Sequence, residues 1–522
     1  MAYVIGLDFG NYNSFPCVVV NGDVNNNRLS GMVVDLLPRY NRAGIPSAFF
    51  YSGREKFKNY ELPWYGDNAV SQRAVPLKNR VRLLKRHLGE SITIDDKCFS
   101  YDEEITNLIQ YIIRKANEEL QKNWMEITDL VSISYPATYS TEERMHLVSL
   151  VENATLEDGR HVKVYGTICE PAAASLDYLA EYQKEVSEET VLTYDLGGGT
   201  FDLAIVTAYP NGKRNANGKT YYYDVVDKCG IAELGGNEFD QIIQQILVEK
   251  LTPEQKSVEI LSEIVSKAEE VKIELSNSNE TWVSIYNPVS RDYIDIEITR
   301  AEFEKASEKY LQDMINLTNK ILADNPSSNP KYIILTGGSS QMPMIKKAIK
   351  KAFPSFSDDQ IVDYRPTKAI AYGAARYGVV EQKDIYDTAL NIVQQHAEYE
   401  IGVRFLKDKH DILVHIHTFV PEKADIPYHS SWVKSYVIHE NTSKVNFRVF
   451  EAIKKSPDCY NIKNHYKEIL SVVLDFKRIL PIGTECESQI IVDKKGVLKI
   501  ISRLVKNHSI QAEGEVKLKN LG

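Results

Sequence analysis

The chain has 522 residues, of which 43% are hydrophobic and 26% are charged, which is typical of a globular protein with room for three or four domains or subdomains. Its net charge of −10 argues against nonspecific nucleic-acid binding, and no apolar run is long enough to span a bilayer. We expect no signal peptide. The six cysteines are scattered and include no C-x-x-C pair, which argues against a zinc site or a disulfide framework, and we therefore expect a cytoplasmic protein.

The first motif lies near the N-terminus, where residues 4–20 read VIGLDFGNYNSFPCVVV. Two apolar runs flank Asp8 and Gly10, so the pattern predicts a β-hairpin with a polar turn. Residues 21–28 read as a second polar turn, and residues 45–50 as a further strand.

A basic segment follows at residues 76–89, PLKNRVRLLKRHLG, in which the leucines have helical spacing. Lys85 is either a solvated helix charge or a lysine directed at a phosphate, and spacing alone does not decide. Residues 101–122 predict a long amphipathic helix with an acidic first turn.

Three further elements follow before the middle of the chain. Residues 130–136 predict a buried strand that ends at Pro136, and residues 141–144 carry a helix-capping signal. Residues 162–168 predict a strand that delivers Glu170 to the start of an alanine-rich helix. Glu170 suits either chemistry or helix capping, and the sequence supports both equally.

Residues 191–206, VLTYDLGGGTFDLAIV, repeat the features of the first hairpin. Asp195 aligns with Asp8, and Gly197 aligns with Gly10, so the chain contains an internal repeat. Glycines in such a turn let backbone N–H groups converge on an anion, and an aspartate at a strand end can hold hydrated Mg²⁺. Two such hairpins, facing each other, would clamp one metal–phosphate group, whereas the Rossmann and P-loop patterns fit neither hairpin.

The next segments predict glycine turns that lead into helices. Residues 234–240 and 332–343 each place glycines before a helix, which suits phosphate or ribose groups. Amphipathic helices are expected at residues 263–276 and 300–322, and a small-residue helix at 367–377. Residues 383–398 read as a poorly patterned connector, and short alternating segments after it predict an all-β sandwich, with a short helix in 454–467.

Several ordered motifs together resemble the 70-kDa heat-shock (Hsp70) chaperone family of actin-like ATPases. They are GLDFGNYNS, LKRHLG, ICEPAAASLDY, DLGGGTFD, LGGNEFD, KAEEVKIELS, LTGGSSQMP and IAYGAA. The resemblance implies an α/β actin-like (ribonuclease H-like) two-lobe ATPase domain at residues 1–382, an interdomain linker at 383–398 and a β-sandwich peptide-binding domain at 399–522. It also implies a Mg²⁺-dependent ATPase that binds ATP and ADP, with K⁺ as a further candidate ion.

The resemblance assigns roles position by position. Metal binding falls to Asp8 and Asp195, and positioning of the attacking water to Lys85 and Glu170. Coupling between domains is assigned to Pro136 and Arg144. The peptide groove is assigned to Val445 and Phe447, although both residues would suit the core of a β-sandwich at least as well. The nucleotide contacts are assigned to Gly10, Asn11, Tyr12, Gly197, Gly198, Gly199, Thr200, Gly235, Gly236, Glu269, Lys272, Ile273, Ser276, Gly337, Gly338, Ser339 and Gln341.

Departures from the family pattern make the rate of hydrolysis an open question. Asn11 and Tyr12 replace two threonines, and Ile273 and Gln341 replace arginines of the adenosine site, which predicts weaker or faster-exchanging nucleotide. The linker lacks the family's leucine-rich run, and the sequence ends where the family's helical lid would begin.

The leading hypothesis is a chaperone for protein folding and stress response that binds extended or unfolded polypeptide under ATP control. By resemblance its partners would include a J-domain co-chaperone and a nucleotide exchange factor, with neither nucleic acid nor membrane. The first alternative is a nucleotide-gated regulatory protein with little hydrolysis or peptide release. The second is a metabolite kinase on the same actin-like scaffold.

Overall fold

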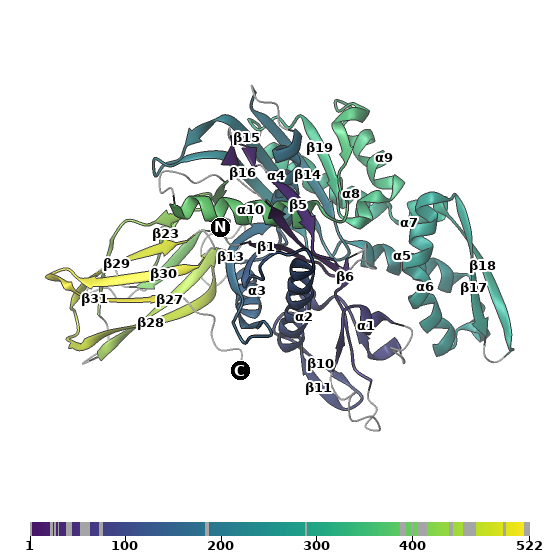
Figure 1. Cartoon of the computed structure of the whole chain (residues 1–522), viewed down its shortest axis with the longest axis horizontal. Helices are drawn as coiled ribbons and strands as arrows, with labels where there is room; N and C mark the ends of the chain where they lie inside the picture. The colour runs from purple at the N-terminus through teal and green to yellow at the C-terminus, as the bar shows by residue number, and fades with distance from the viewer. Residues whose placement is uncertain are drawn as a thin grey trace.

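The computed structural model contains two large sheets with helices around them and a separate group of strands at one end of the molecule (Figure 1). Most of residues 21–28 and 454–467, where a turn and a short helix are predicted, lies outside the described residues. The structure describes residues 3–20, 24–25, 28–29, 31–37, 44–52, 63–71, 77–182, 187–287, 290–386, 393–397, 400–405, 415–437, 442–452, 466–493 and 497–515.

Sheet 1 has six strands, ordered β13-β12-β1-β2-β5, with β6 paired to β2. The predicted helix over residues 101–122 is confirmed as α2, and a capping box between Ser140 and Glu143 begins α3. The bounds are β1 (Ile5–Phe9), β2 (Asn13–Val20), β5 (Met32–Asp35), β6 (Ile45–Pro46), α2 (Tyr101–Lys122), β12 (Leu130–Tyr135), α3 (Thr141–Asn153) and β13 (Lys163–Cys169). Smaller elements beside them are β3 (Val24–Asn25), β4 (Arg28–Leu29), β7 (Phe49–Phe50), β8 (Trp64–Tyr65), α1 (Asp67–Val70), β9 (Arg80–Val81), β10 (Ser91–Ile94) and β11 (Lys97–Ser100).

Sheet 2 has seven strands, ordered β20-β19-β14-β15-β16-β21-β24, and buries a second apolar core against its helices. The prediction of a single helix over residues 300–322 is wrong in one respect, because the chain forms two helices, α7 and α8, that are separated at Ser307. The strands of sheet 2 are β14 (Glu189–Leu196), β15 (Phe201–Arg214), β16 (Thr220–Ile231), β19 (Tyr332–Thr336), β20 (Ile361–Asp363), β21 (Val393–His396) and β24 (Asp425–Ile426). A separate antiparallel pair is formed by β17 (Glu280–Asn287) and β18 (Asp292–Thr299). The helix bounds are α5 (Gly236–Glu249), α6 (Val258–Asn277), α7 (Arg300–Ala306), α8 (Glu308–Asp324) and α9 (Pro343–Ala352).

Two helices rich in small residues are packed between the two sheets. Helix α10 (Ala369–Tyr386) packs on β1 and β2 of sheet 1, and α4 (Glu170–Tyr182) packs on β14 and β15 of sheet 2. The helices also pack on each other, so closely that a Cβ at Gly373 would lie 1.8 Å from the carbonyl oxygen of Ala173. The small residues predicted at 367–377 therefore serve this contact, and the helix continues beyond the predicted end to Tyr386.

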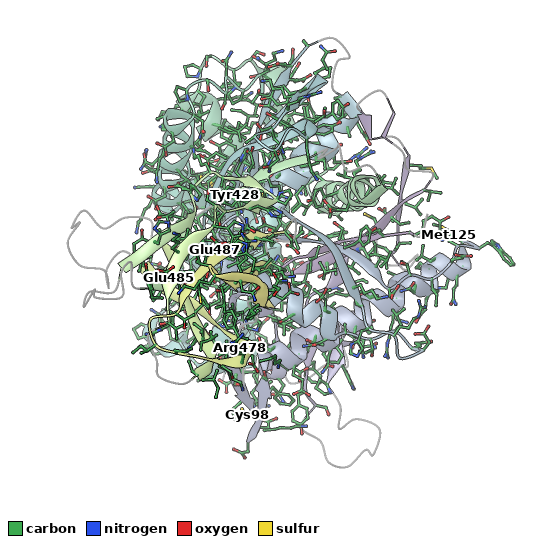
Figure 2. All side chains as sticks on the ribbon, turned by 90° about the vertical axis from the view of Figure 1, so that its left-hand side faces the viewer. Cys98, Met125, Tyr428, Arg478, Glu485 and Glu487 are labelled. Carbon is green, nitrogen blue, oxygen red and sulfur yellow. The ribbon has the colours of Figure 1, made fainter. Side chains whose placement is uncertain are left out.

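The predicted sandwich is present as two antiparallel sheets that share an apolar core. One has the order β23-β22-β27-β28, and the other has the order β25-β29-β30-β31 with β26 on β29. Figure 2 views this end of the molecule and labels Tyr428, Arg478, Glu485 and Glu487 on it. The bounds are β22 (Ile401–Phe405), β23 (His415–Val420), β25 (Tyr428–His429), β26 (Val433–Tyr436), β27 (Thr442–Ala452), β28 (Tyr466–Leu480), β29 (Glu485–Val492), β30 (Leu498–Leu504) and β31 (Asn507–Glu515).

Two expectations from composition concern membranes and cysteines. Within the described ranges, no helix combines the length and the apolar character needed to cross a bilayer. The cysteines at 17, 98, 169, 229 and 486 are not joined by disulfides to any described residue, while Cys459 lies outside the described residues.

The predicted connector at 383–398 contains an ordered strand, β21 (Val393–His396), which the sequence analysis missed. It pairs in parallel with β16 of sheet 2 and antiparallel with β24 (Asp425–Ile426), which lies along the chain between the sandwich strands β23 and β25. His396 lies between two carboxylates, with Nε2 2.7 Å from Asp224 and Nδ1 3.1 Å from Asp425. This one side chain therefore ties β16 of sheet 2 to the segment between two strands of the sandwich.

We expect this contact to weaken as the pH rises. Burial by itself lowers the pKa of His396, but the hydrogen bond and charge of Asp224, together with the charge of Asp425, raise it above its usual value of 6.5. A raised pKa in the folded state means that the contact is fully stabilised below about pH 6.5 and loses that stabilisation as the pH passes through the raised value. The other charged groups beside His396 are Asp227, Lys228, Glu422 and Lys423.

Amide hydrogen exchange of residues 393–396, corrected for the intrinsic pH dependence of exchange, measures this effect. The wild type should lose protection of β21 by about tenfold for each unit by which the pKa is raised. His396→Gln keeps hydrogen-bonding capacity but cannot be charged, so its protection should be independent of pH. The same pH profile in both proteins would contradict the assignment to His396.

Candidate functional site

The two predicted hairpins are present and have the same register. In each, a four-residue turn joins the strands, so Phe9 pairs with Ser14 in the first and Leu196 pairs with Phe201 in the second. Asp8 and Asp195 each occupy the position one residue farther from the turn, where Asp8 faces Phe15 and Asp195 faces Asp202. The internal repeat predicted from the sequence is therefore a structural repeat, with one hairpin in each large sheet.

Asp202 is a site residue that the sequence analysis did not assign. Because directly opposed residues of an antiparallel pair project from the same face, Asp195 and Asp202 point the same way. Glu170, the first residue of α4, joins them, and one oxygen from each of the three carboxylates lies within 4.8 Å of the others. All three side chains are buried.

Burial and mutual repulsion oppose ionisation of these carboxylates. Burial, with the charge of Glu170, raises the pKa of Asp8 to about 7, although Lys85 and Ser134 lower it. Burial and Glu170 likewise raise the pKa of Asp202 to about 7. Burial also raises the pKa of Asp195 well above its usual value, with Glu170, Asp202 and Asp8 adding to the effect. A bound cation would relieve this repulsion, because it favours the ionised form of each group.

Lys85 supplies a positive charge to this cluster. Its ammonium group forms an ion pair with Glu170, and the lysine is only 4% exposed. The predicted α-helix around Lys85 is wrong: residues 84–86 form a single 3₁₀ turn, preceded by Leu83 in the left-handed conformation. The hydroxyl of Tyr139 donates to the carbonyl of Lys85 at 2.8 Å, so tertiary contacts rather than helical periodicity hold this segment.

The chemistry of the cluster fits Mg²⁺. Magnesium prefers oxygen ligands and in nucleotide sites takes one or two carboxylates together with waters and phosphates. Asp195 offers a buried Oδ1 that has no hydrogen-bond partner among the described residues, and Glu170 and Asp202 lie next to it. Asp8 was predicted as a ligand with Asp195; it lies outside this group of three, but both line the same cavity.

The second glycine turn faces the first turn across the cavity at close range. A Cβ at Gly198 would lie 2.3 Å from the ring of Tyr12, and a Cβ at Gly199 would lie 2.1 Å from Nδ2 of Asn11. A side chain at either position would therefore have to displace Tyr12 or Asn11. Helix α5 begins beside them, because the amide of Gly236 donates to the carbonyl of Gly197 at 2.9 Å. The amide of Asn237 donates to the carbonyl of Gly198 at the same distance, so the first N–H groups of α5 hold the second glycine turn in place rather than an anion, which corrects the expectation for this helix start.

The opposite side of the cavity is formed by α6 and the turn after β19. Gly337 has a φ of +80°, and a Cβ there would lie 2.3 Å from the carbonyl oxygen of Leu196, so only glycine fits. Ile273 on α6 is 55% exposed and offers an apolar surface rather than a charge. The cavity has a volume of about 400 Å³. Its predicted lining residues are Asp8, Gly10, Asn11, Tyr12, Lys85, Glu170, Asp195, Gly197, Gly198, Gly199, Thr200, Gly236, Glu269, Lys272, Ile273, Ser276, Gly337, Gly338, Ser339 and Gln341.

Several lining residues were not singled out from the sequence. Their side chains are apolar, amide or hydroxyl groups to which the sequence assigned no role, although Asn13, Phe15, Met342 and Ile370 lie within quoted motifs. They comprise Asn13, Phe15, Asn277, Met342, Pro366, Thr367 and Ile370. Asn13 and Phe15 could have been indicated only by their proximity in sequence to the first glycine turn. The remaining residues line the cavity because the tertiary fold brings their segments to it, which no local sequence pattern records.

The other predicted residues lie elsewhere. Gly235 stands behind the second glycine turn, where a Cβ would lie 2.6 Å from the amide nitrogen of Gly199. Pro136 is buried just after β12, and Arg144 lies on α3, with its guanidinium 5.5 Å from the ring centroid of Tyr135. On the same helix Met145 packs into the sandwich core.

The two predicted groove residues lie on β27 of the sandwich. Phe447 is 5% exposed and belongs to the sandwich core, while Val445 is partly buried against that core. Phe447 pairs with Val472 of the neighbouring strand β28. The position of Phe447 fits the core interpretation that the sequence left open beside the groove interpretation.

Comparison with protein-family models gives one match. The family model described as "Hsp70 protein" matches residues 65–518 of this chain. The match covers most of the chain and extends from the segment before Lys85 through the sandwich, so it includes the second glycine turn but not the first.

Proposed function

The chain belongs to the Hsp70 family of nucleotide-binding chaperones, and we propose that it is an ATP-driven chaperone that binds extended polypeptide. One observation carries the proposal: two hairpins of equal register place their aspartates and glycine turns around one cavity of about 400 Å³ that also contains Lys85 and Glu170. Such an arrangement suits the phosphates and metal of a nucleotide.

Residues 1–382 would form an actin-like two-lobe ATPase domain, with one lobe around each large sheet and α4 and α10 between them. Residues 383–398 would be the interdomain linker, and residues 399–522 the peptide-binding domain. The order of strands in both sheets and the position of the cavity between the two hairpins support this division.

Hydrolysis of a phosphoanhydride requires charge stabilisation and positioning more than a strong base. When bound, Mg²⁺ would neutralise charge on the phosphate oxygens, and Asp195 and Asp8 would hold it through waters. Lys85 would orient the attacking water beside the transferred phosphoryl group, and Glu170 would hold the lysine through its ion pair. Thr200 and the amides of the glycine turns would bind phosphate oxygens.

Coupling to the sandwich would pass through two contacts. The first is β21, which continues sheet 2 toward the sandwich. The second is α3, where Glu142 pairs with Lys467 of β28 at 2.9 Å and Met145 packs into the sandwich core. Arg144 lies between these two contacting residues on α3, which supports the coupling role proposed for it. A rearrangement of the cleft would then alter how tightly the sandwich holds a peptide.

A regulatory protein with little hydrolysis is the second candidate, and one observation favours it. Asn11 and Tyr12 pack directly against Gly199 and Gly198, so their side chains take up room between the two turns.

Single-turnover hydrolysis of radiolabelled ATP tests the proposal. We expect phosphate release that requires Mg²⁺ and is unaffected by added sugars. Tight ATP binding without phosphate release would favour the regulatory protein, transfer to a sugar hydroxyl would indicate a kinase, and absence of nucleotide binding would overturn the proposal.

A further inference from the structure

Tyr12 spans the cleft from the first turn to the opposite side. Its ring packs against Gly198 of the second turn, so closely that a Cβ at Gly198 would lie 2.3 Å from a ring carbon. Its hydroxyl donates a hydrogen bond to Oδ2 of Asp240 on α5 at 3.3 Å. The guanidinium of Arg82 lies 5.3 Å from the ring centroid and supports the ring from the sheet 1 side. One side chain therefore joins both glycine turns and a helix of sheet 2.

Asp240, the acceptor, is itself fixed in place. Its Oδ1 lies 2.7 Å from the ammonium group of Lys272, which also donates to the carbonyl of Gly236 at 3.0 Å. Both charged side chains are buried, so this ion pair is little screened by solvent. Burial and the charge of Asp240 raise the pKa of Tyr12, and the phenol therefore remains a hydrogen-bond donor at neutral pH.

Resting on the nucleotide-binding function proposed above, we propose that Tyr12 is a positioning residue that holds the two turns together and slows nucleotide exchange. Tyr12 belongs to the turn at the phosphate end of the cavity, and its partner Asp240 pairs with Lys272. Lys272 lies on α6 beside Ile273, at the proposed adenosine end, so these contacts link the two ends of the cavity. A nucleotide held between the turns would leave as they separate, and separation would break the bond from Tyr12 to Asp240.

A second link crosses the cleft at the same end and would remain in a Tyr12 variant. Arg86, next to Lys85, forms a two-pronged ion pair with Glu238 of α5, with N···O distances of 2.8 and 2.9 Å. Arg86 also donates to the carbonyl of Gly199. Loss of the tyrosine hydroxyl should therefore speed opening without separating the two sides permanently.

Stopped-flow displacement of fluorescent ADP from the Mg²⁺-loaded full-length protein tests the proposal. Tyr12→Phe should release ADP about three- to tenfold faster than the wild type, because it loses one hydrogen bond to a charged group. Tyr12→Ala should release it faster still, since the ring over Gly198 is also lost. Tyr293→Phe, on the exposed face of β18, is the matched control and should behave as wild type.

Amide hydrogen exchange of the nucleotide-free protein supplies an independent measurement. Residues 196–201 and 235–240 should exchange faster in Tyr12→Phe, whereas β12 and the sandwich should be unchanged. If the wild type binds no ADP, the proposed function fails, and hydrogen exchange still decides whether Tyr12 holds the turns together. ADP release and protection that are both the same in Tyr12→Phe as in the wild type would overturn the role of the hydroxyl.

Discussion

Lys85→Met is expected to reduce single-turnover ATP hydrolysis by about a hundredfold or more, while ATP affinity changes only a few-fold. The lysine is buried and faces Glu170 within a cluster that also contains Asp8, Asp195 and Asp202. Its charge lowers the pKa of Asp8 and Asp202, so its loss should raise both pKa values and leave more of these carboxylates protonated at neutral pH. The residual hydrolysis of the variant should therefore increase with pH.

The matched control for this experiment is Lys78→Met. Lys78 belongs to the same segment, but its side chain is 72% exposed and pairs with Asp95 at 3.3 Å on the surface. Surface pairs of this kind contribute little, so this variant should hydrolyse ATP at the wild-type rate. Calorimetric titration with ATP checks that both variants fold and bind. Hydrolysis by Lys85→Met within threefold of wild type would contradict the role proposed for the lysine.

Gly373→Ala is expected to lower the melting temperature by about 5 °C or more, which corresponds to a loss of about 2–3 kcal/mol of stability. Alanine within a helix normally stabilises it by about 1 kcal/mol relative to glycine. At Gly373, however, the added methyl group would lie 1.8 Å from the carbonyl oxygen of Ala173, a backbone atom that cannot move alone. Steric overlap should therefore outweigh the gain in helix propensity and push α10 away from α4.

Differential scanning calorimetry of the nucleotide-free protein measures this change. Gly338→Ala is the control, because a Cβ there meets no atom of the described residues within 4 Å and its φ is not in the left-handed region. It should melt within about 1 °C of wild type, as substitutions away from packed contacts usually do. A melting temperature for Gly373→Ala at or above that of the wild type would show that the two helices separate at little cost.

The parts of the site that follow from local pattern were predictable from the sequence. Alternating apolar residues on either side of a glycine turn predicted both hairpins, and their shared aspartates revealed the repeat. Asp202 was within reach of the same reasoning, because a four-residue turn at 197–200 places it opposite Asp195. A prediction of strand register, added to the motif, would have identified the third carboxylate.

Other features depend on contacts that no local pattern records. The leucines around Lys85 have helical spacing, yet Arg86 bonds to Glu238 and Tyr139 bonds to the carbonyl of Lys85, and these contacts hold the chain in a 3₁₀ turn. Strand β21 contains Gln394, Gln395 and His396, which do not alternate in polarity. It becomes a strand because β16 offers an edge with which it can pair.

The affinity of an extended hydrophobic peptide, measured by fluorescence anisotropy with ADP and then with Mg-ATP, tests the central claim most directly. The account predicts that the peptide binds in the ADP state and that ATP weakens binding several-fold, since closure of the cleft would act on the sandwich through β21 and α3. Peptide binding that is the same with either nucleotide, or absent with both, would contradict the account.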